Sequence, residues 1–102
     1  MAKQSYAAVE ELMSPRAPVV IYTTRFCPFC IRAKQLLASK QVDFDERPVD
    51  NDSALRAEMT KKAGSRTVPQ IWIGDVHVGG CDELFQLERQ QRLDDLLGRT
   101  QE

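Results

Sequence analysis

The sequence predicts an α/β fold in which helices flank a mixed four-stranded sheet, with an extra helix at the N-terminus. An unbroken apolar run at residues 19–22 is typical of a strand that is buried on both faces of a sheet. A helical pattern follows this run and leads to a second strand, so the two strands should be parallel and joined by a right-handed crossover. Two apolar segments on either side of Gly74-Asp75 predict an antiparallel hairpin that completes the sheet.

The N-terminal part of the chain has a helical pattern of its own. Apolar residues from Tyr6 to Leu12 are spaced as one face of a helix. Ser14-Pro15 then breaks the pattern, because proline does not continue a helix. We therefore expect a helical extension over residues 1–16 and one further domain over residues 17–102.

Helices and strands alternate through that domain. The expected strands cover residues 19–22, 42–45, 70–73 and 76–78. The expected helices cover residues 28–40, a segment from about 53 to 63, and two segments carrying Leu84/Phe85 and Leu93/Leu96/Leu97. Cys30, Ala33 and Leu37 form the inward stripe of the first of these helices. A polar residue among 50–53 should cap the second helix, and Gly64 should end it.

Composition and charge exclude several classes of partner. The chain has 102 residues, of which 42% are hydrophobic, and this suits a single soluble domain. The net charge is −1 with acids and bases interspersed, so we expect no nucleic-acid or membrane partner. No apolar run approaches the roughly 20 residues that span a bilayer, and the N-terminus lacks the apolar stretch of a secretion signal. Three cysteines are too few for a secreted disulfide framework, so we expect a reducing compartment, the cytoplasm. We also expect a monomer.

Two cysteines lie where the first strand should meet the first long helix, in Cys27-Pro28-Phe29-Cys30. Cys27 would stand at the helix N-terminus, where backbone N–H groups and the helix dipole favour a thiolate, and Arg25 adds positive charge. Pro28 suits the first helical turn, since the N–H that it lacks would have no partner there. Cys30 lies one turn farther on, on the inward side. We therefore expect Cys27 to be the nucleophile and Cys30 the resolving thiol.

A structural zinc site is the main alternative use of two such cysteines. It needs four ligands, and a second cysteine pair or a histidine pair is missing from the sequence. Cys81 and His77 do not make a recognisable second half of a site. We therefore expect no bound metal ion.

Two more motifs follow in order, Thr67-Val68-Pro69 before a strand and Gly79-Gly80-Cys81-Asp82 before a helix. Together with the cysteine motif, their order and separation over about residues 17–98 resemble the glutaredoxin family. The resemblance implies a thioredoxin-like fold and a dithiol oxidoreductase. It also implies that this enzyme reduces glutathione mixed disulfides and protein disulfides, with glutathione as co-substrate and no bound cofactor.

The resemblance further implies a site for glutathione. Pro69 would be cis and face the cysteines, and the Val68 backbone would pair with the cysteinyl part of the ligand. Glycines allow a ligand to approach the backbone, a helix N-terminus binds a carboxylate, and Asp82 could accept from an ammonium group. An N-cap role is the alternative for Asp82. The expected glutathione-binding residues are Arg25, Phe29, Arg66, Thr67, Val68, Pro69, Gly80, Cys81 and Asp82.

The sequence departs from the family at two positions. Thr24 stands where many glutaredoxins carry a lysine, so the corresponding charge is expected from Arg25 or Arg66. Phe29 replaces the usual tyrosine, which removes a hydroxyl contact and keeps the packing of the ring. Cys81 fits a small buried residue or a secondary oxidation site, and His77 an exposed strand residue.

Two other functions remain open. One is a redoxin that is driven by thioredoxin reductase, against which Asp82 and the double glycine argue. The other is a protein in which two chains, each with Cys27 and a glutathione thiolate, hold a [2Fe–2S] cluster. Glutaredoxins that bind such clusters usually lack a proline after the first cysteine, so Pro28 argues against this function.

Overall fold

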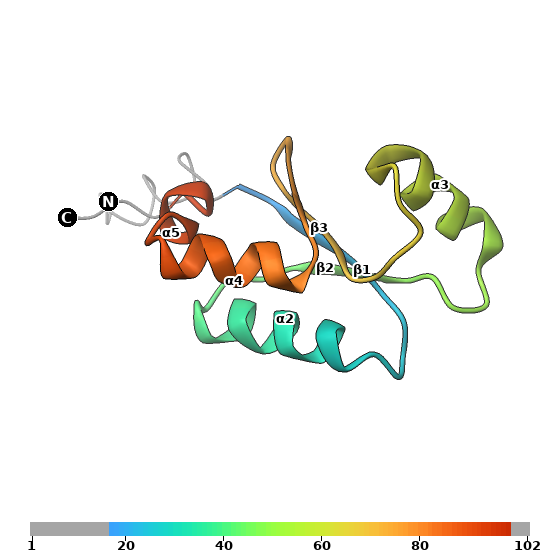
Figure 1. Ribbon diagram of the computed structural model, residues 1–102, viewed down its shortest axis with the longest axis horizontal. Helices are drawn as coiled ribbons and strands as arrows, with labels where there is room; N and C mark the ends of the chain where they lie inside the picture. Colours follow the sequence, from blue (N-terminus) through green and yellow to red (C-terminus); the bar gives the residue numbers. More distant parts are fainter. Residues whose placement is uncertain (1–16, 99–102) are drawn as a thin grey trace, which may run out of the picture.

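The structure, a computed structural model, describes residues 17–98. The expected helical extension over residues 1–16 lies outside the described residues. Within them, the order of elements predicted from the sequence is confirmed (Figure 1). The elements are β1 (Val19–Thr23), α2 (Pro28–Ser39), β2 (Asp45–Pro48), α3 (Ser53–Ala63), β3 (Gln70–Ile73), β4 (Val76–Gly79), α4 (Cys81–Arg89) and α5 (Leu93–Leu96).

The four strands form one mixed sheet in the order β2-β1-β3-β4. β1 and β2 are parallel, and α2 is the crossover between them. β1 and β3 are antiparallel, as are β3 and β4, which are joined by the predicted turn with Gly74 at φ 59°. A positive φ suits glycine, which has no Cβ to clash with the backbone. The sheet and its flanking helices confirm the predicted α/β class.

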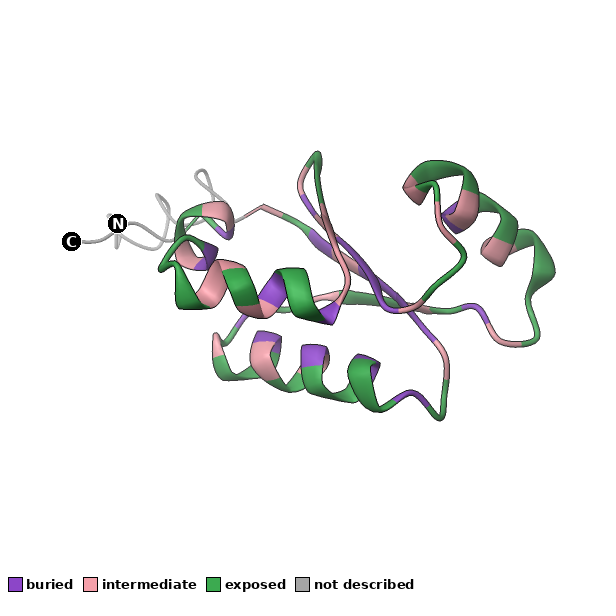
Figure 2. Ribbon diagram, viewed as in Figure 1, coloured by how far each residue is buried: buried purple, intermediate pink, exposed green. Residues whose placement is uncertain are grey.

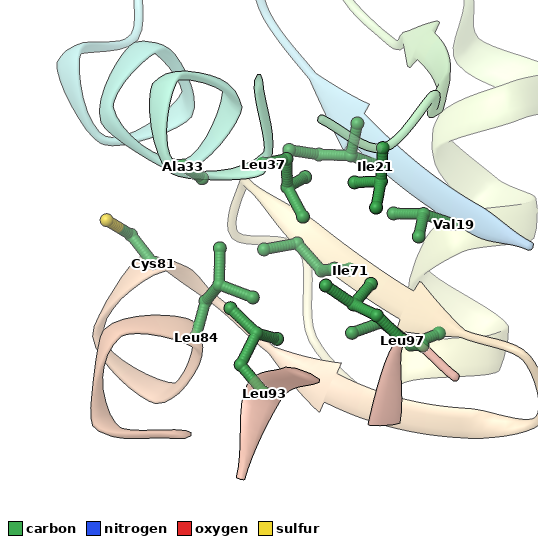
Figure 3. Close-up of a cluster of buried hydrophobic side chains, with 11 residues drawn as sticks. Val19, Ile21, Ala33, Leu37, Ile71, Cys81, Leu84, Leu93 and Leu97 are labelled. Carbon is green, nitrogen blue, oxygen red and sulfur yellow. The ribbon is translucent and has the colours of Figure 1, made fainter. Parts of the chain in front are cut away.

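The side chains of the central strands alternate between two packed faces. Val19 and Ile21 of β1 join a cluster with residues of α2, α4 and α5, which Figure 3 shows in close-up. Tyr22 points to the other face and packs with Val49 and with Met59 of α3. Figure 2 shows the resulting burial along the central strands and on the inward faces of α2 and α4. The sheet therefore has α2, α4 and α5 on one face and α3 on the other.

The second strand lies later in the chain than the sequence pattern predicts. The expected strand over residues 42–45 is wrong, and pairing with β1 begins only at Asp45, opposite Val20. Val42 is instead buried in the core and its N–H contacts the Leu37 carbonyl at 3.5 Å, which completes the end of α2. The apolar residues at positions 42 and 44 therefore belong to a connecting segment that packs against the core and not to a strand. β2 itself is polar and lies at the edge of the sheet, where a proline is tolerated.

Local capping sets the ends of α3 as expected. The Asp52 side chain accepts a hydrogen bond from the Leu55 N–H at 3.0 Å, and Gly64 ends the helix at φ 73°. The loop that follows leads into β3 beside the N-terminal ends of α2 and α4. No helix in the described part of the chain has the length and apolar character to cross a membrane.

Candidate active site

Cys27 is the N-cap residue of α2. Its backbone is extended, with φ −127° and ψ 103°, and its sulfur accepts a hydrogen bond from the Cys30 N–H at 3.1 Å. Pro28 occupies the start of the helix as predicted, and the first turn of α2 carries no acidic residue. The sulfur therefore meets the positive end of the helix dipole and one of its free N–H donors, both of which stabilise a thiolate.

Cys30 differs from Cys27 in burial and in protonation. Its side chain is 1% exposed, against 9% for Cys27. Burial, followed by the contact with Cys27, raises the pKa of the Cys30 thiol from 9.0 to about 12. Cys30 is therefore protonated at neutral pH, while Cys27 lies at the N-terminus of α2 with the Cys30 N–H directed at its sulfur. This asymmetry agrees with the roles that the sequence predicts.

The segment before β3 places a carbonyl next to Cys27. The Val68–Pro69 peptide bond is cis, as the family resemblance implies. The Val68 carbonyl oxygen lies 4.0 Å from the Cys27 sulfur, within reach of a weak S–H···O contact. The cysteine motif and this segment, 41 residues apart in sequence, thus meet at one point.

A cavity of about 360 Å³ lies beside this point; Val68 and, from the cysteine motif, Phe29 line it, whereas Cys27 and Cys30 do not. Its lining comes from the cysteine motif, the loop before β3, the end of β4 and the start of α4. The lining residues are Phe29, Ser65, Thr67, Val68, Pro69, Gln70, His77, Gly79, Gly80, Cys81, Asp82 and Glu83. Seven of the nine residues predicted to bind glutathione are among them, and Arg25 and Arg66 are not.

The start of α4 forms the far wall of the cavity. Gly80 is the N-cap residue, and its N–H donates to the Glu83 carboxylate at 2.8 Å. The alternative that Asp82 caps this helix is therefore wrong, because Glu83 fills the role. Asp82 is exposed and lines the cavity. A Cβ on Gly80 would lie 3.4 Å from the Pro69 carbonyl oxygen, so the two walls approach each other to about van der Waals distance at this point.

The two predicted arginines lie elsewhere. Arg25 pairs with Asp50 at 3.2 Å, and its side chain is 69% exposed. Arg66 is exposed, and its backbone carbonyl accepts a hydrogen bond from Arg56 at 3.1 Å. A role for either arginine in binding glutathione stays a prediction.

Five lining residues are absent from the predicted glutathione-binding set, namely Ser65, Gln70, His77, Gly79 and Glu83. One signal was present in the sequence: Gln70 is polar and opens an otherwise apolar strand. Cys81 is 5% exposed and lies at the margin of the core cluster in Figure 3, and burial raises the pKa of its thiol. The described residues contain no group of three His, Cys, Asp or Glu side chains that could hold a metal ion.

A thiol at a helix N-terminus, with a buried partner thiol one helical turn away, can form and break a disulfide. The fold and this site define a thiol–disulfide oxidoreductase with a thioredoxin-like fold.

Comparison with known proteins agrees with this class. The glutaredoxin family model matches residues 19–78. A glutaredoxin from Pseudomonas aeruginosa is 66% identical over 80 residues, which cover 78% of this chain and 95% of the relative. The solution structure of a Brucella melitensis glutaredoxin has a TM-score of 0.73 at 51% identity, covering 81% of this chain and 90% of that one. A buckwheat glutaredoxin–glutathione complex has a TM-score of 0.74 at 26% identity, covering 96% and 94%. The chain belongs to the glutaredoxin family.

The raised pKa of Cys30 predicts a loss of stability at alkaline pH. Above about pH 8.5 the unfolded chain releases this proton while the folded protein retains it, so stability falls as pH rises toward 12. Urea unfolding at pH 8 and pH 10.5, under a non-thiol reductant, should show a larger loss for the wild type than for Cys30→Ser. Cys81 and Lys40, whose pKa values are also raised, affect both proteins alike. Equal losses in the two proteins would contradict the prediction.

Proposed function

We propose that this protein is a glutathione-dependent oxidoreductase that reduces glutathione mixed disulfides and protein disulfides through Cys27 and Cys30. The observation that carries the proposal is the cavity of about 360 Å³ that runs from the cysteine motif to the start of α4. The buckwheat relative was solved as a complex with glutathione, which supports this choice of ligand. We also propose that the protein acts in the cytoplasm as a monomer.

The chemistry of the cavity suits the two ends of glutathione. Its cysteinyl part would pair with the Val68 backbone next to Cys27. Its γ-glutamyl end carries a carboxylate and an ammonium group on one carbon. The carboxylate would meet the N-terminus of α4, and the ammonium group would meet Asp82. Asp82 is free for this contact because Glu83 caps the helix.

The reduction of a glutathione mixed disulfide needs only Cys27. Its thiolate attacks the glutathione sulfur, forms a Cys27–glutathione disulfide and releases the substrate thiolate, which takes a proton from water. A second glutathione thiolate then attacks the glutathione sulfur of that disulfide. Glutathione disulfide leaves, and the Cys27 thiolate is restored.

The reduction of a protein disulfide needs Cys30 as well. Cys27 attacks one sulfur of the substrate and forms a mixed disulfide, which removes the charge on Cys27. That charge contributes to the high pKa of Cys30, so its removal makes the Cys30 proton easier to lose. Cys30 then attacks the Cys27 sulfur and expels the substrate thiolate. Glutathione reduces the resulting Cys27–Cys30 disulfide.

The identity of the electron donor is the first test. The substrate is a glutathionylated cysteinyl peptide, supplied either with glutathione, glutathione reductase and NADPH or with thioredoxin reductase and NADPH. We expect turnover with glutathione and none with Cys27→Ser, because every covalent intermediate passes through that sulfur. Turnover with thioredoxin reductase alone would overturn the proposal.

The Cys30→Ser variant separates the two routes. Serine is nearly isosteric, and the Cys30 N–H that contacts Cys27 remains, so the variant should keep or exceed wild-type turnover of the glutathionylated peptide. It should lose most of its activity on a protein disulfide, measured in the same preparation. Cys81→Ser is the matched thiol control: the ratio of its two activities should equal that of the wild type, because Cys81 has no part in resolving a mixed disulfide. A parallel loss of both activities in Cys30→Ser would show that the one-cysteine route is wrong.

Asp82→Ala should raise the apparent KM for glutathione by about 10-fold and leave the rate of Cys27 alkylation unchanged. The reason is that Asp82 would pair with the far end of the ligand, at an exposed position where solvent screens part of the attraction. Asp95→Ala removes the same charge from α5 and serves as the control. An unchanged glutathione dependence in Asp82→Ala would remove this residue from the site.

A further inference from the structure

Gln70 is a buried polar side chain with several hydrogen bonds. It opens β3 opposite Tyr22 and is 4% exposed; of the described residues, only Thr23 is also polar and buried. Its amide nitrogen contacts the Thr67 carbonyl oxygen at 3.0 Å and the Thr67 hydroxyl at 3.2 Å. Its amide oxygen lies 2.7 Å from Nε2 of His77 in β4. Gln70 thus joins β4 to the loop before β3.

The chemistry of these partners sets the direction of each hydrogen bond. The Thr67 carbonyl can only accept, so the NH₂ group of Gln70 must face it. The Gln70 amide oxygen then faces His77 and must accept. Nε2 of His77 therefore carries a proton and donates.

Both ends of this network are held in place. The His77 ring stacks on Trp72 with a centroid distance of 4.5 Å and an interplanar angle of 23°. At the other end, the Thr67 hydroxyl lies 2.9 Å from the Ser65 hydroxyl, which also accepts from the Thr67 N–H at 3.2 Å. The loop is therefore anchored to the sheet just before Val68, whose carbonyl oxygen lies 4.0 Å from the Cys27 sulfur.

We propose that Gln70 and His77 are positioning residues that hold Thr67 and thereby orient the Val68 backbone for the ligand. The inference rests on the proposed function, in which that backbone pairs with glutathione. Neither side chain contacts the reacting sulfur, since their hydrogen bonds end at Thr67. Loss of the His77 donor should therefore weaken ligand binding and leave the chemistry at Cys27 unchanged.

Two variants of His77 test the contributions of its N–H donor and of its aromatic ring separately. His77→Phe keeps a flat ring against Trp72 and removes the N–H, whereas His77→Gln keeps an N–H donor at similar reach and removes the ring. KM and kcat are measured with the glutathionylated cysteinyl peptide, and the rate of Cys27 alkylation is measured alongside. We expect His77→Phe to raise KM about 3- to 10-fold with kcat and alkylation unchanged, and His77→Gln to restore most of the affinity. Val76→Ala, at the exposed neighbouring position in β4, should match the wild type.

Each other outcome counts against the inference. An unchanged KM in His77→Phe, or a KM that rises equally in both variants, would overturn it. A fall in kcat at constant KM would assign His77 a structural role only and would also overturn it. The wild type tests the proposed function separately: if it fails to turn over the glutathionylated peptide, that function falls and the inference falls with it. If the wild type is active, a negative result for the variants removes the inference alone.

Discussion

The hydrogen bond from the Cys30 N–H to the Cys27 sulfur depends on where α2 begins: β1 ends at Thr23, and α2 starts shortly afterwards at Pro28, so that Cys27 is its N-cap residue. The start of the helix must therefore be held in register with the end of the strand. Burial of the inward face of α2 in the core contributes to this. Glu46 of β2 contributes as well, since its carboxylate accepts from Thr23 at the end of β1 at 2.8 Å and from Lys34 of α2 at 2.9 Å. One hydrogen bond and one ion pair to Glu46 thus join β1 and α2 to the edge strand β2 near the turn that carries Cys27.

Burial then gives the three thiols different chemistry. Cys27 lies at a helix end that offers N–H donors to its sulfur, whereas Cys30 and Cys81 lie deeper and have raised pKa values. Two neighbouring thiolates would repel each other, and the high pKa of Cys30 prevents that state before substrate arrives. Once Cys27 is part of a disulfide, part of the cause of that high pKa disappears. In the mechanism that we propose, the resolving step can therefore follow the first attack and not compete with it.

The sequence predicted correctly those elements whose ends depend on local signals. The prediction was wrong where the position of an element depends on tertiary contacts. The ends of α3 follow from Asp52 and Gly64, which act through their own backbone neighbourhood. The position of β2 depends on pairing with β1, which the apolar alternation at Val42 does not encode. In the site, the sequence motifs identified residues of the cavity walls. They did not identify His77, whose contact with Gln70 joins two strands of the hairpin. Which of Glu83 and Asp82 accepts the Gly80 N–H at the start of α4 likewise depends on side-chain geometry.

Stabilisation of the thiolate depends mainly on the backbone. The family resemblance led us to expect a charged side chain, Arg25 or Arg66, in place of the lysine that Thr24 replaces. Arg25 is paired with Asp50 and largely exposed, so its field at Cys27 is partly neutralised and screened by solvent. The Cys30 N–H is fixed by the fold, donates to the Cys27 sulfur and needs no side-chain rotamer to be ordered. The backbone at this turn therefore offers a thiolate a hydrogen bond that does not depend on a lysine at position 24.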